Sequence, residues 1–201
     1  MSEQLLEFDA EEHIYKLSGQ TIPNVTRIIG DQFPLHIPED RARYARALGR
    51  AIHSACALYD ENRLDFDSLD PKVVPYLRAW IKFKEQTQCI IISVEQSVHH
   101  PVLRYAGTLD RILFLARERA VLDLKRPLLT ARVGVQLAAY QHAYNAQLGR
   151  AKRAQHVTAR YGLQLRADET YRLRRYEDSS DFSIFVASLN IFHWRQLHNE
   201  I

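Results

Sequence analysis

Two aspartates and one lysine, in and beside two apolar runs, are the residues of this sequence best suited to chemistry. Asp110 interrupts the run at 108–116, Asp123 interrupts the run at 119–124, and Lys125 follows two residues later. Runs this rich in Leu, Ile, Val and Phe predict two paired strands. Because residues two apart in a strand share a face, Asp123 and Lys125 project together, and Asp110 can join them across a hairpin.

These charges predict a metal site. An acid within an apolar strand is costly unless something compensates its charge. The two carboxylates, the backbone carbonyl of Leu124 and the Lys125 ammonium form a hard oxygen site suited to Mg²⁺, which metal-assisted phosphodiester hydrolysis requires. The D-L-K tripeptide alone leaves an alternative open, in which Lys125 forms a salt bridge to Asp110 on the neighbouring strand.

Length and composition indicate a soluble globular protein. The chain has 201 residues, enough for one domain with a core, and we expect a single domain at 1–201. No apolar run approaches the roughly 20 residues of a membrane span, and the N-terminus lacks a signal peptide's features, so we expect a cytoplasmic protein without membrane contact. Cys56 and Cys89 are isolated, which excludes a four-cysteine zinc or iron–sulfur site.

The charge distribution favours a polyanionic partner. The net charge is only +3, but residues 131–175 carry nine Lys and Arg against two Asp and Glu. A basic excess at and after the candidate site fits a nucleic acid. The alternative is an ordinary solvated face, since arginines are common on outer strands.

Hydrophobic periodicity and turn residues predict the remaining elements. The first half contains a hairpin at 5–17 with a turn near Ala10, a short helix that Asn24 or Thr26 caps and Gly30 ends, a long helix at about 38–61, and a helix that follows an Asp70 cap. The second half contains a strand at 89–98, a helix at 132–148, edge strands at 152–161, 163–166 and 170–175, and a C-terminal helix.

The long helix carries a second group of candidates. Arg46, Arg50 and His53 lie on one arc of it at i, i+4 and i+7. His53 is a candidate metal ligand or phosphate contact, with the arginines on phosphates; the alternative is a histidine with no special role. Gly49 costs a helix roughly 1 kcal/mol relative to alanine, which suggests that something approaches the backbone closely.

Three further polar residues lie on elements next to the acidic strands. Glu95, late in its strand, is either a further metal or water ligand or a charge in solvent. Gln136 and Tyr140 lie four residues apart on one stripe of their helix. Such side chains can hydrogen-bond a phosphate or stack on a base, or else form a polar-tipped packing face.

Taken in chain order, these motifs resemble the RecB-like branch of the PD-(D/E)xK nuclease superfamily. The motifs are G-R-A-I-H with His53, the strand with Glu95, G-T-L-D with Asp110, D-L-K with Asp123 and Lys125, and Q-L-A-A-Y with Gln136 and Tyr140. The segment I-P-N-V-T-R-I-I also looks like the opening of phage-type and mitochondrial genome maintenance exonucleases. The resemblance spans nearly the whole chain.

The resemblance implies an α/β, restriction-endonuclease-like fold, a central mixed β-sheet flanked by helices on both sides. It implies Mg²⁺ or Mn²⁺ held by His53, Asp110, Asp123 and the Leu124 carbonyl. Lys125 would orient or help deprotonate the attacking water and stabilise charge at the phosphate, as part of a catalytic set with the acids. Gln136 and Tyr140 would position the substrate strand, and Glu95 would complete a second metal shell.

Two features qualify the resemblance. Arg126 stands where the family usually has a small Ser or Thr, so it either reaches a phosphate or crowds the site. The sequence has no cysteine cluster, so we expect no iron–sulfur cluster.

A histidine ligand suits Mn²⁺ well, and we therefore expect activity with Mn²⁺ at least equal to that with Mg²⁺.

The expected function is that of a metal-dependent DNA exonuclease of phage type, acting on single strands or DNA ends. One alternative is a DNA-binding accessory protein of recombination or replication that has lost catalysis. Another is a structure-specific endonuclease with the same chemistry. The expected partners are DNA and proteins of recombination or replication, in the cytoplasm of a bacterial or phage-infected cell.

Overall fold

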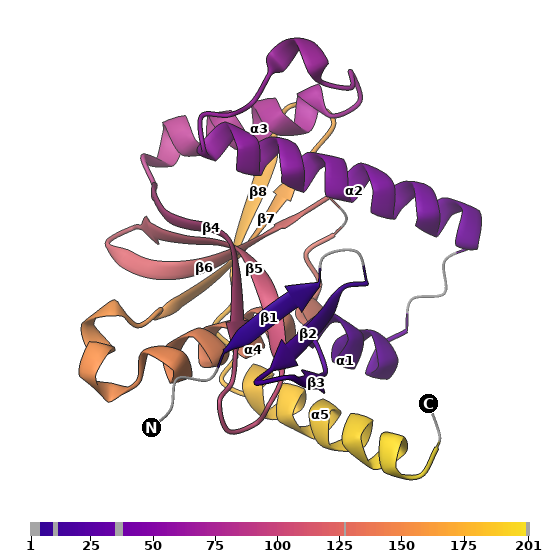
Figure 1. The fold of residues 1–201 in the computed structure, drawn as a ribbon. Coiled ribbons are helices and arrows are strands. Elements are labelled where there is room, and N and C mark those ends of the chain that lie inside the picture. The colour runs from indigo at the N-terminus through magenta and orange to yellow at the C-terminus, as the bar shows by residue number, and fades with distance from the viewer. Residues whose placement is uncertain (1–4, 10–11, 35–37, 127, 200–201) are drawn as a thin grey trace.

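A five-stranded mixed sheet lies at the centre of the fold (Figure 1). The computed structural model describes residues 5–9, 12–34, 38–126 and 128–199. In spatial order, the strands are β4 (Ile90–His99), β5 (Ala106–Leu115), β6 (Glu118–Lys125), β7 (Ala159–Leu165) and β8 (Tyr171–Arg175). Helices pack on both faces of this sheet, so the predicted α/β class with a flanked central mixed sheet is confirmed.

The β5–β6 hairpin carries the two acidic strands and forms as predicted. The strands pair antiparallel from the turn as far as Arg111↔Leu122. Ala116 and Arg117 close the turn with φ of 49° and 68°, the left-handed values that a two-residue type I′ turn requires. β6 then pairs in parallel with β7, and the crossover between them contains α4 (Ala131–Leu148).

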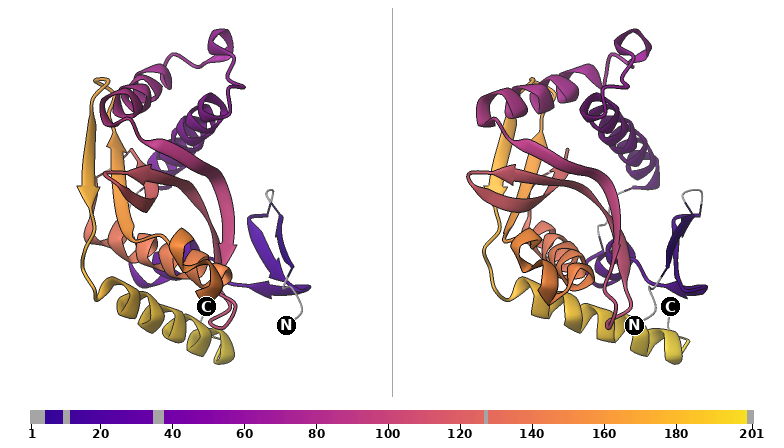
Figure 2. Two further views of the ribbon diagram at one scale, coloured as in Figure 1. Left: turned by 90° about the vertical axis from the view of Figure 1, so that its left-hand side faces the viewer. Right: turned by 60° about the vertical axis from the view of Figure 1, so that its left-hand side comes forward.

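Two hydrophobic cores, one on each face of the sheet, hold the helices (Figure 2). The other helices are α1 (Val25–Gln32), α2 (Glu39–Asp60), η1 (Phe66–Ser68), α3 (Val74–Thr87), η2 (Arg150–Gln155) and α5 (Asp181–Leu197). Trp80 of α3 shares one core with Leu122, and Phe185 of α5 shares the other with Ile112. Within the described residues, no helix combines the length and apolar character needed to cross a bilayer.

A small antiparallel sheet near the N-terminus is attached to the start of β5. Its strands are β1 (Leu6–Asp9), β2 (Ile14–Leu17) and β3 (Gln20–Ile22). The Ala106 N–H donates to the Pro23 carbonyl at 3.0 Å, which links this sheet to the central one. The predicted hairpin at 5–17 is confirmed as β1 and β2, and β3 adds a strand that the sequence did not predict. The predicted turn near Ala10 lies outside the described residues.

Two predicted helix ends are wrong. Asn24 caps α1 as predicted, but the helix continues two residues beyond Gly30, which keeps a negative φ and does not terminate it. α3 does not start directly after an Asp70 cap. The Asp70 carboxylate instead accepts a hydrogen bond from the Lys72 N–H at 2.8 Å, which stabilises a turn before the helix begins.

The basic segment at 151–175 differs most from its prediction. The predicted strand at 152–161 begins as the 3₁₀ helix η2, and β7 is one continuous strand, buried at every position between β6 and β8. Of the predicted edge strands, β8 alone lies at a sheet edge. Arg160 can be buried in β7 because it donates to the Asp181 carboxylate at 2.8 Å, a partner on α5 that no local pattern reveals.

Candidate active site

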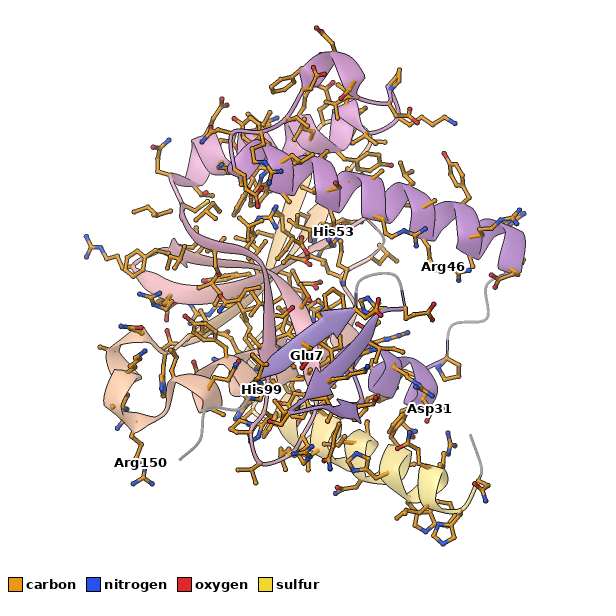
Figure 3. All side chains as sticks on the ribbon, in the orientation of Figure 1. Glu7, Asp31, Arg46, His53, His99 and Arg150 are labelled. Carbon is orange, nitrogen blue, oxygen red and sulfur yellow. The ribbon has the colours of Figure 1, made fainter. Side chains whose placement is uncertain are left out.

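A cavity of about 1040 Å³ opens between α2, the N-terminal sheet and the strands β4 to β6. The predicted site residues that line it are Arg46, Arg50, His53, Glu95, Asp110, Asp123, Lys125, Gln136 and Tyr140. Figure 3 places Arg46 and His53 along the side of α2 that faces this region. Leu124 and Arg126 are not among the lining residues. The cavity therefore brings together candidates from five separate elements.

Asp110 lies at the point where the β5–β6 ladder ends. Beyond the Arg111↔Leu122 pair, its carboxylate Oδ2 accepts the Leu124 N–H at 2.6 Å, and Oδ1 lies 3.3 Å from Nδ1 of His53. Burial opposes the charge of Asp110, but His53, Lys125 and the Leu124 N–H outweigh burial and lower its pKa to about 2. Asp110 is thus ionised at neutral pH and already aimed at His53.

Glu95 occupies a strained position on β4, across from Asp110. Its neighbours Val94 and Gln96 pair with Arg111 and Leu109, while Glu95 itself has a φ of 46°. A left-handed backbone at a non-glycine residue costs about 1–3 kcal/mol and is found preferentially at functional sites. The side chain stays 40% exposed, yet partial burial and the nearby Asp110 raise the pKa of Glu95 to about 7.

The ligand atoms of His53, Glu95 and Asp110 all lie within 4.8 Å of one another. Burial disfavours the imidazolium form of His53, but the Asp110 carboxylate outweighs burial and raises the pKa of His53 to about 9. In the protein without metal, the proton on His53 therefore neutralises part of the acidic cluster. A divalent cation binding these atoms would replace that proton.

Asp123 and Lys125 face the same cavity from β6. The Lys125 Nζ lies 2.7 Å from Asp123 Oδ2, so Lys125 pairs with the acid on its own strand rather than forming the alternative salt bridge to Asp110. Burial disfavours the charged form of each group. Burial and Asp110 together raise the pKa of Asp123 to about 6, whereas the two carboxylates raise the pKa of Lys125.

α4 supports Asp123 from the opposite side. The Gln136 amide donates to Asp123 Oδ1 at 3.3 Å and to the Tyr140 hydroxyl at 3.1 Å. The Tyr140 ring passes over Gly107, where an added Cβ would lie 2.6 Å from the ring. Gly107 is therefore required for the approach of α4 to β5 that brings Gln136 to Asp123.

The donor set fits a divalent cation. It combines three carboxylates and one imidazole, ligands that Mn²⁺ and Mg²⁺ sites use. Asp123 Oδ2 is buried and lies 2.7 Å from the Lys125 ammonium, so this carboxylate is held in place beside the cluster. The sequence placed Asp123 among the ligands and Glu95 in an outer role, whereas the structure gathers Glu95 with His53 and Asp110 and holds Asp123 beside Lys125.

Arg111 is a structural support of the site that the sequence did not reveal. Its side chain is fully buried and donates to the Asp110 carbonyl at 2.6 Å, to Glu95 at 3.3 Å and to Asp60 at 2.7 Å. Lys84 also contacts Asp60, at 2.6 Å, and balances the charge. The available signal was an arginine inside an apolar strand directly after Asp110.

The arginines of 150–175 contribute nothing to the lining of the cavity. Arg175 pairs with Glu118 at 2.7 Å and Arg174 donates to the Leu129 carbonyl at 2.7 Å, both away from it. Within the described residues, the cations that line the cavity are Arg46, Arg50, Lys125 and Arg132, with His53. The positive charge at the site therefore comes mainly from α2 and the start of α4.

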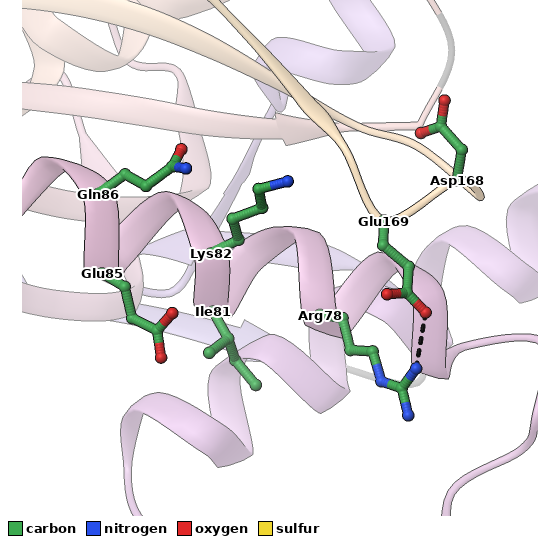
Figure 4. A pocket seen from close by; sticks show the side chains of 7 residues that line it. All are labelled: Arg78, Ile81, Lys82, Glu85, Gln86, Asp168 and Glu169. Atoms are coloured by element: carbon green, nitrogen blue, oxygen red, sulfur yellow. Dashed lines mark hydrogen bonds and ion pairs between the residues drawn. The ribbon is translucent and has the colours of Figure 1, made fainter.

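A second hollow of about 530 Å³ lies between α3 and the β7–β8 turn (Figure 4). An ion pair between Arg78 and Glu169, 2.7 Å long, crosses it. Its lining residues are charged or polar apart from Ile81, and include neither histidine nor cysteine. It offers no arrangement comparable to the acidic cluster.

No protein-family model and no curated protein matches this sequence. Among solved structures, the crystal structure of LHK-Exo in complex with dAMP is similar, with 11% sequence identity and a TM-score of 0.34. The match covers 89% of this chain and 94% of that chain. A TM-score of this size does not establish a shared fold.

Proposed function

We propose that this protein is a divalent-metal-dependent DNA nuclease that hydrolyses phosphodiester bonds, acting as an exonuclease on single strands or DNA ends. The observation that carries the proposal is the cluster of His53, Glu95 and Asp110, with ligand atoms within 4.8 Å, in the same cavity as the Asp123–Lys125 pair. An acidic cluster next to a lysine, in a cleft lined by arginines, suits an anionic substrate.

The metal would be held by His53, Glu95 and Asp110, with Asp123 and the Leu124 carbonyl as further donors. When bound, a divalent cation supplies Lewis acidity toward the scissile phosphate and the attacking water. We take Mn²⁺ and Mg²⁺ as candidates, and the imidazole of His53 favours Mn²⁺. Initial rates in the two metals test this point, and absence of activity in Mn²⁺ would contradict it.

The protein side chains supply charge and orientation. Lys125 remains protonated because the carboxylates raise its pKa, so its ammonium can stabilise charge that develops on the phosphate. Gln136 fixes the orientation of Asp123 through its hydrogen bond. Arg46 and Arg50, both exposed on α2, would bind phosphates of the substrate strand on either side of the reacting one.

Cleavage of an end-labelled single-stranded oligonucleotide, with Mg²⁺, Mn²⁺ or EDTA, tests the proposal. We expect metal-dependent laddering from one end by the wild type and none by Asp123→Ala, which also loses metal binding. Tight DNA binding without cleavage in any metal would instead indicate an accessory DNA-binding protein. Cleavage of closed single-stranded circles would indicate an endonuclease.

A further inference from the structure

The cavity has two unlike walls. Arg46 and Arg50 of α2 and Arg132 of α4 line it with positive charge, whereas the N-terminal region contributes Tyr15 of β2 and His13 of the turn that precedes β2. In the view of Figure 1, α2 lies above β1 and β2. A nucleotide likewise has an anionic phosphate, which suits the wall of arginines, and an aromatic base, which suits the wall with His13 and Tyr15.

The aromatic wall is a packed group of three rings. The Phe8 ring stacks on the Tyr15 ring at 4.5 Å, and the His13 ring meets both edge-on, at 5.3 Å from Phe8 and 5.8 Å from Tyr15. Tyr15 is buried, so its faces are already covered, whereas His13 is exposed. His13 is therefore the ring of this group that both lines the cavity and offers accessible surface.

The wall is fixed to β5, the strand that carries Asp110. The Tyr15 hydroxyl and Thr108 Oγ1 are hydrogen-bonded at 2.8 Å, and Ser97 Oγ lies 3.1 Å from the same atom. Thr108 is two residues before Asp110 on β5. Through this contact, His13 is held in a defined position relative to the acidic cluster instead of on a free hairpin.

We propose that His13 is a stacking platform for an unpaired nucleobase of the strand whose phosphates lie against the arginines of α2. This inference rests on the proposed nuclease function and deepens it, because it names the feature that would favour unpaired DNA. An imidazole face tolerates any base, since every base presents a π-face, so the contact would select single strands without selecting sequence. A base inside a duplex is already stacked on its neighbours and could not occupy the platform.

Fluorescence anisotropy with a labelled single-stranded oligonucleotide tests the inference. The binding buffer contains Ca²⁺ in place of Mg²⁺, and gels of the same samples show whether the oligonucleotide has been cleaved. The oligonucleotide is compared with one that carries abasic residues on the same backbone. We expect His13→Ala to weaken binding of the intact strand about tenfold and His13→Phe to preserve it, as expected for loss or retention of one stacked base. We expect abasic DNA to bind wild type and His13→Ala equally.

The control is His198→Ala, which removes a histidine stacked on Trp194 outside the cavity and should leave binding unchanged. Equal losses for intact and abasic DNA in His13→Ala would overturn the inference, because the contact would then be to the backbone. Wild type that binds both strands equally would overturn it as well, while leaving the nuclease proposal intact. Wild type that binds neither strand would refute the proposed function, and this inference with it.

Discussion

Asp110 accepts a hydrogen bond that a backbone carbonyl would otherwise accept. The Leu124 N–H lies where the antiparallel ladder of β5 and β6 has ended, and the Asp110 carboxylate takes it at 2.6 Å. An unpaired N–H buried there would be destabilising, so the acid stabilises the sheet as well as facing His53. This dual role explains how an apolar strand tolerates a buried carboxylate.

Lys125→Ala should strongly reduce cleavage while DNA binding is retained. The substitution removes the ammonium next to Asp123 but leaves Arg46, Arg50 and the acidic cluster in place. Loss of a preorganised charge at a developing oxyanion typically costs about 10²–10³-fold in kcat. Single-turnover cleavage and anisotropy, measured on the same preparation, check this. A variant that cleaves at the wild-type rate would exclude the proposed role of Lys125.

Arg111→Lys should reduce both stability and cleavage. Lysine keeps the charge but cannot donate to the Asp110 carbonyl, Glu95 and Asp60 together. We expect a loss of roughly 1–3 kcal/mol in the free energy of unfolding, as for other broken buried hydrogen bonds. Urea denaturation measures it.

The matched control for Arg111→Lys is Arg78→Lys, since Arg78 forms an exposed ion pair with Glu169. Exposed pairs contribute about 0–1 kcal/mol, so this variant should unfold like the wild type. If the two variants were equally stable, the buried network around Arg111 would be of no energetic importance.

The catalytic candidates could be predicted from sequence because a charged residue inside an apolar run is visible in the sequence itself. Asp110 and Asp123 stand out within apolar runs, and the spacing of Lys125 fixes its side of the strand. The role of Arg111 could not be read in this way, since its partner Asp60 lies 51 residues away. Asp110 was predicted beside His53, but the grouping of Glu95 with these two was not, because the backbone of Glu95 has a positive φ within the strand that pairs with β5.

Among the elements, α2 contains a glycine that lowers the stability of the helix but leaves space open in the cavity. Gly49 lies in its middle and lines the cavity, yet within the part of the chain that the structure describes, no atom beyond its own chain neighbours and helix turn would lie within 4 Å of an added Cβ. Packing within the protein therefore does not explain the glycine. Under the proposed function, we expect the glycine to leave room for a substrate strand beside the helix.

Gly49→Ala should stabilise the protein and impair the enzyme. Alanine in a helix interior is favoured over glycine by roughly 0.5–1 kcal/mol, which thermal unfolding would detect. KM for a single-stranded substrate should rise severalfold, because the methyl group enters the cavity. Ala47→Gly, at an exposed position of the same helix, should lose stability and keep KM. An unchanged KM in Gly49→Ala would show that no substrate atom approaches this turn.

The order of strands was less predictable than their existence. The apolar runs predicted β4, β5 and β6 within a residue or two. The sequence predicts edge strands at 152–161 and 163–166, where the structure has the single inner strand β7. Burial of Arg160 depends on Asp181, which the chain brings back only through α5, so the error arose from a long-range pair.

For the molecule as a whole, metal binding should be coupled to proton release. The pKa of His53 is about 9 without metal, so at neutral pH the cation must displace the proton of the imidazole. Affinity for Mn²⁺ should therefore rise about tenfold per pH unit as the pH increases from about 6 to about 8. Glu95 has a pKa of about 7, so at the acidic end of this range metal binding should release a further proton from Glu95.

Isothermal titration calorimetry of Mn²⁺ binding, in buffers of different ionisation enthalpy, measures the released protons directly. His53→Gln should bind Mn²⁺ more weakly and release about one proton fewer, because a neutral amide has no proton to lose. Affinity that does not vary with pH would mean that His53 does not ligate the metal. This test needs no substrate and no turnover.

The parallel pairing of β6 with β7 has a consequence for the order of synthesis. Every residue found to line the cavity lies between His13 and Tyr140, whereas the strand that covers β6 begins at Ala159. A nascent chain on the ribosome therefore presents all of these side chains while β6 is still an uncovered edge. Asp123 gains its neighbour Gly162 only once β7 has emerged, so the growing chain carries the residues of the proposed site before the sheet around them is complete.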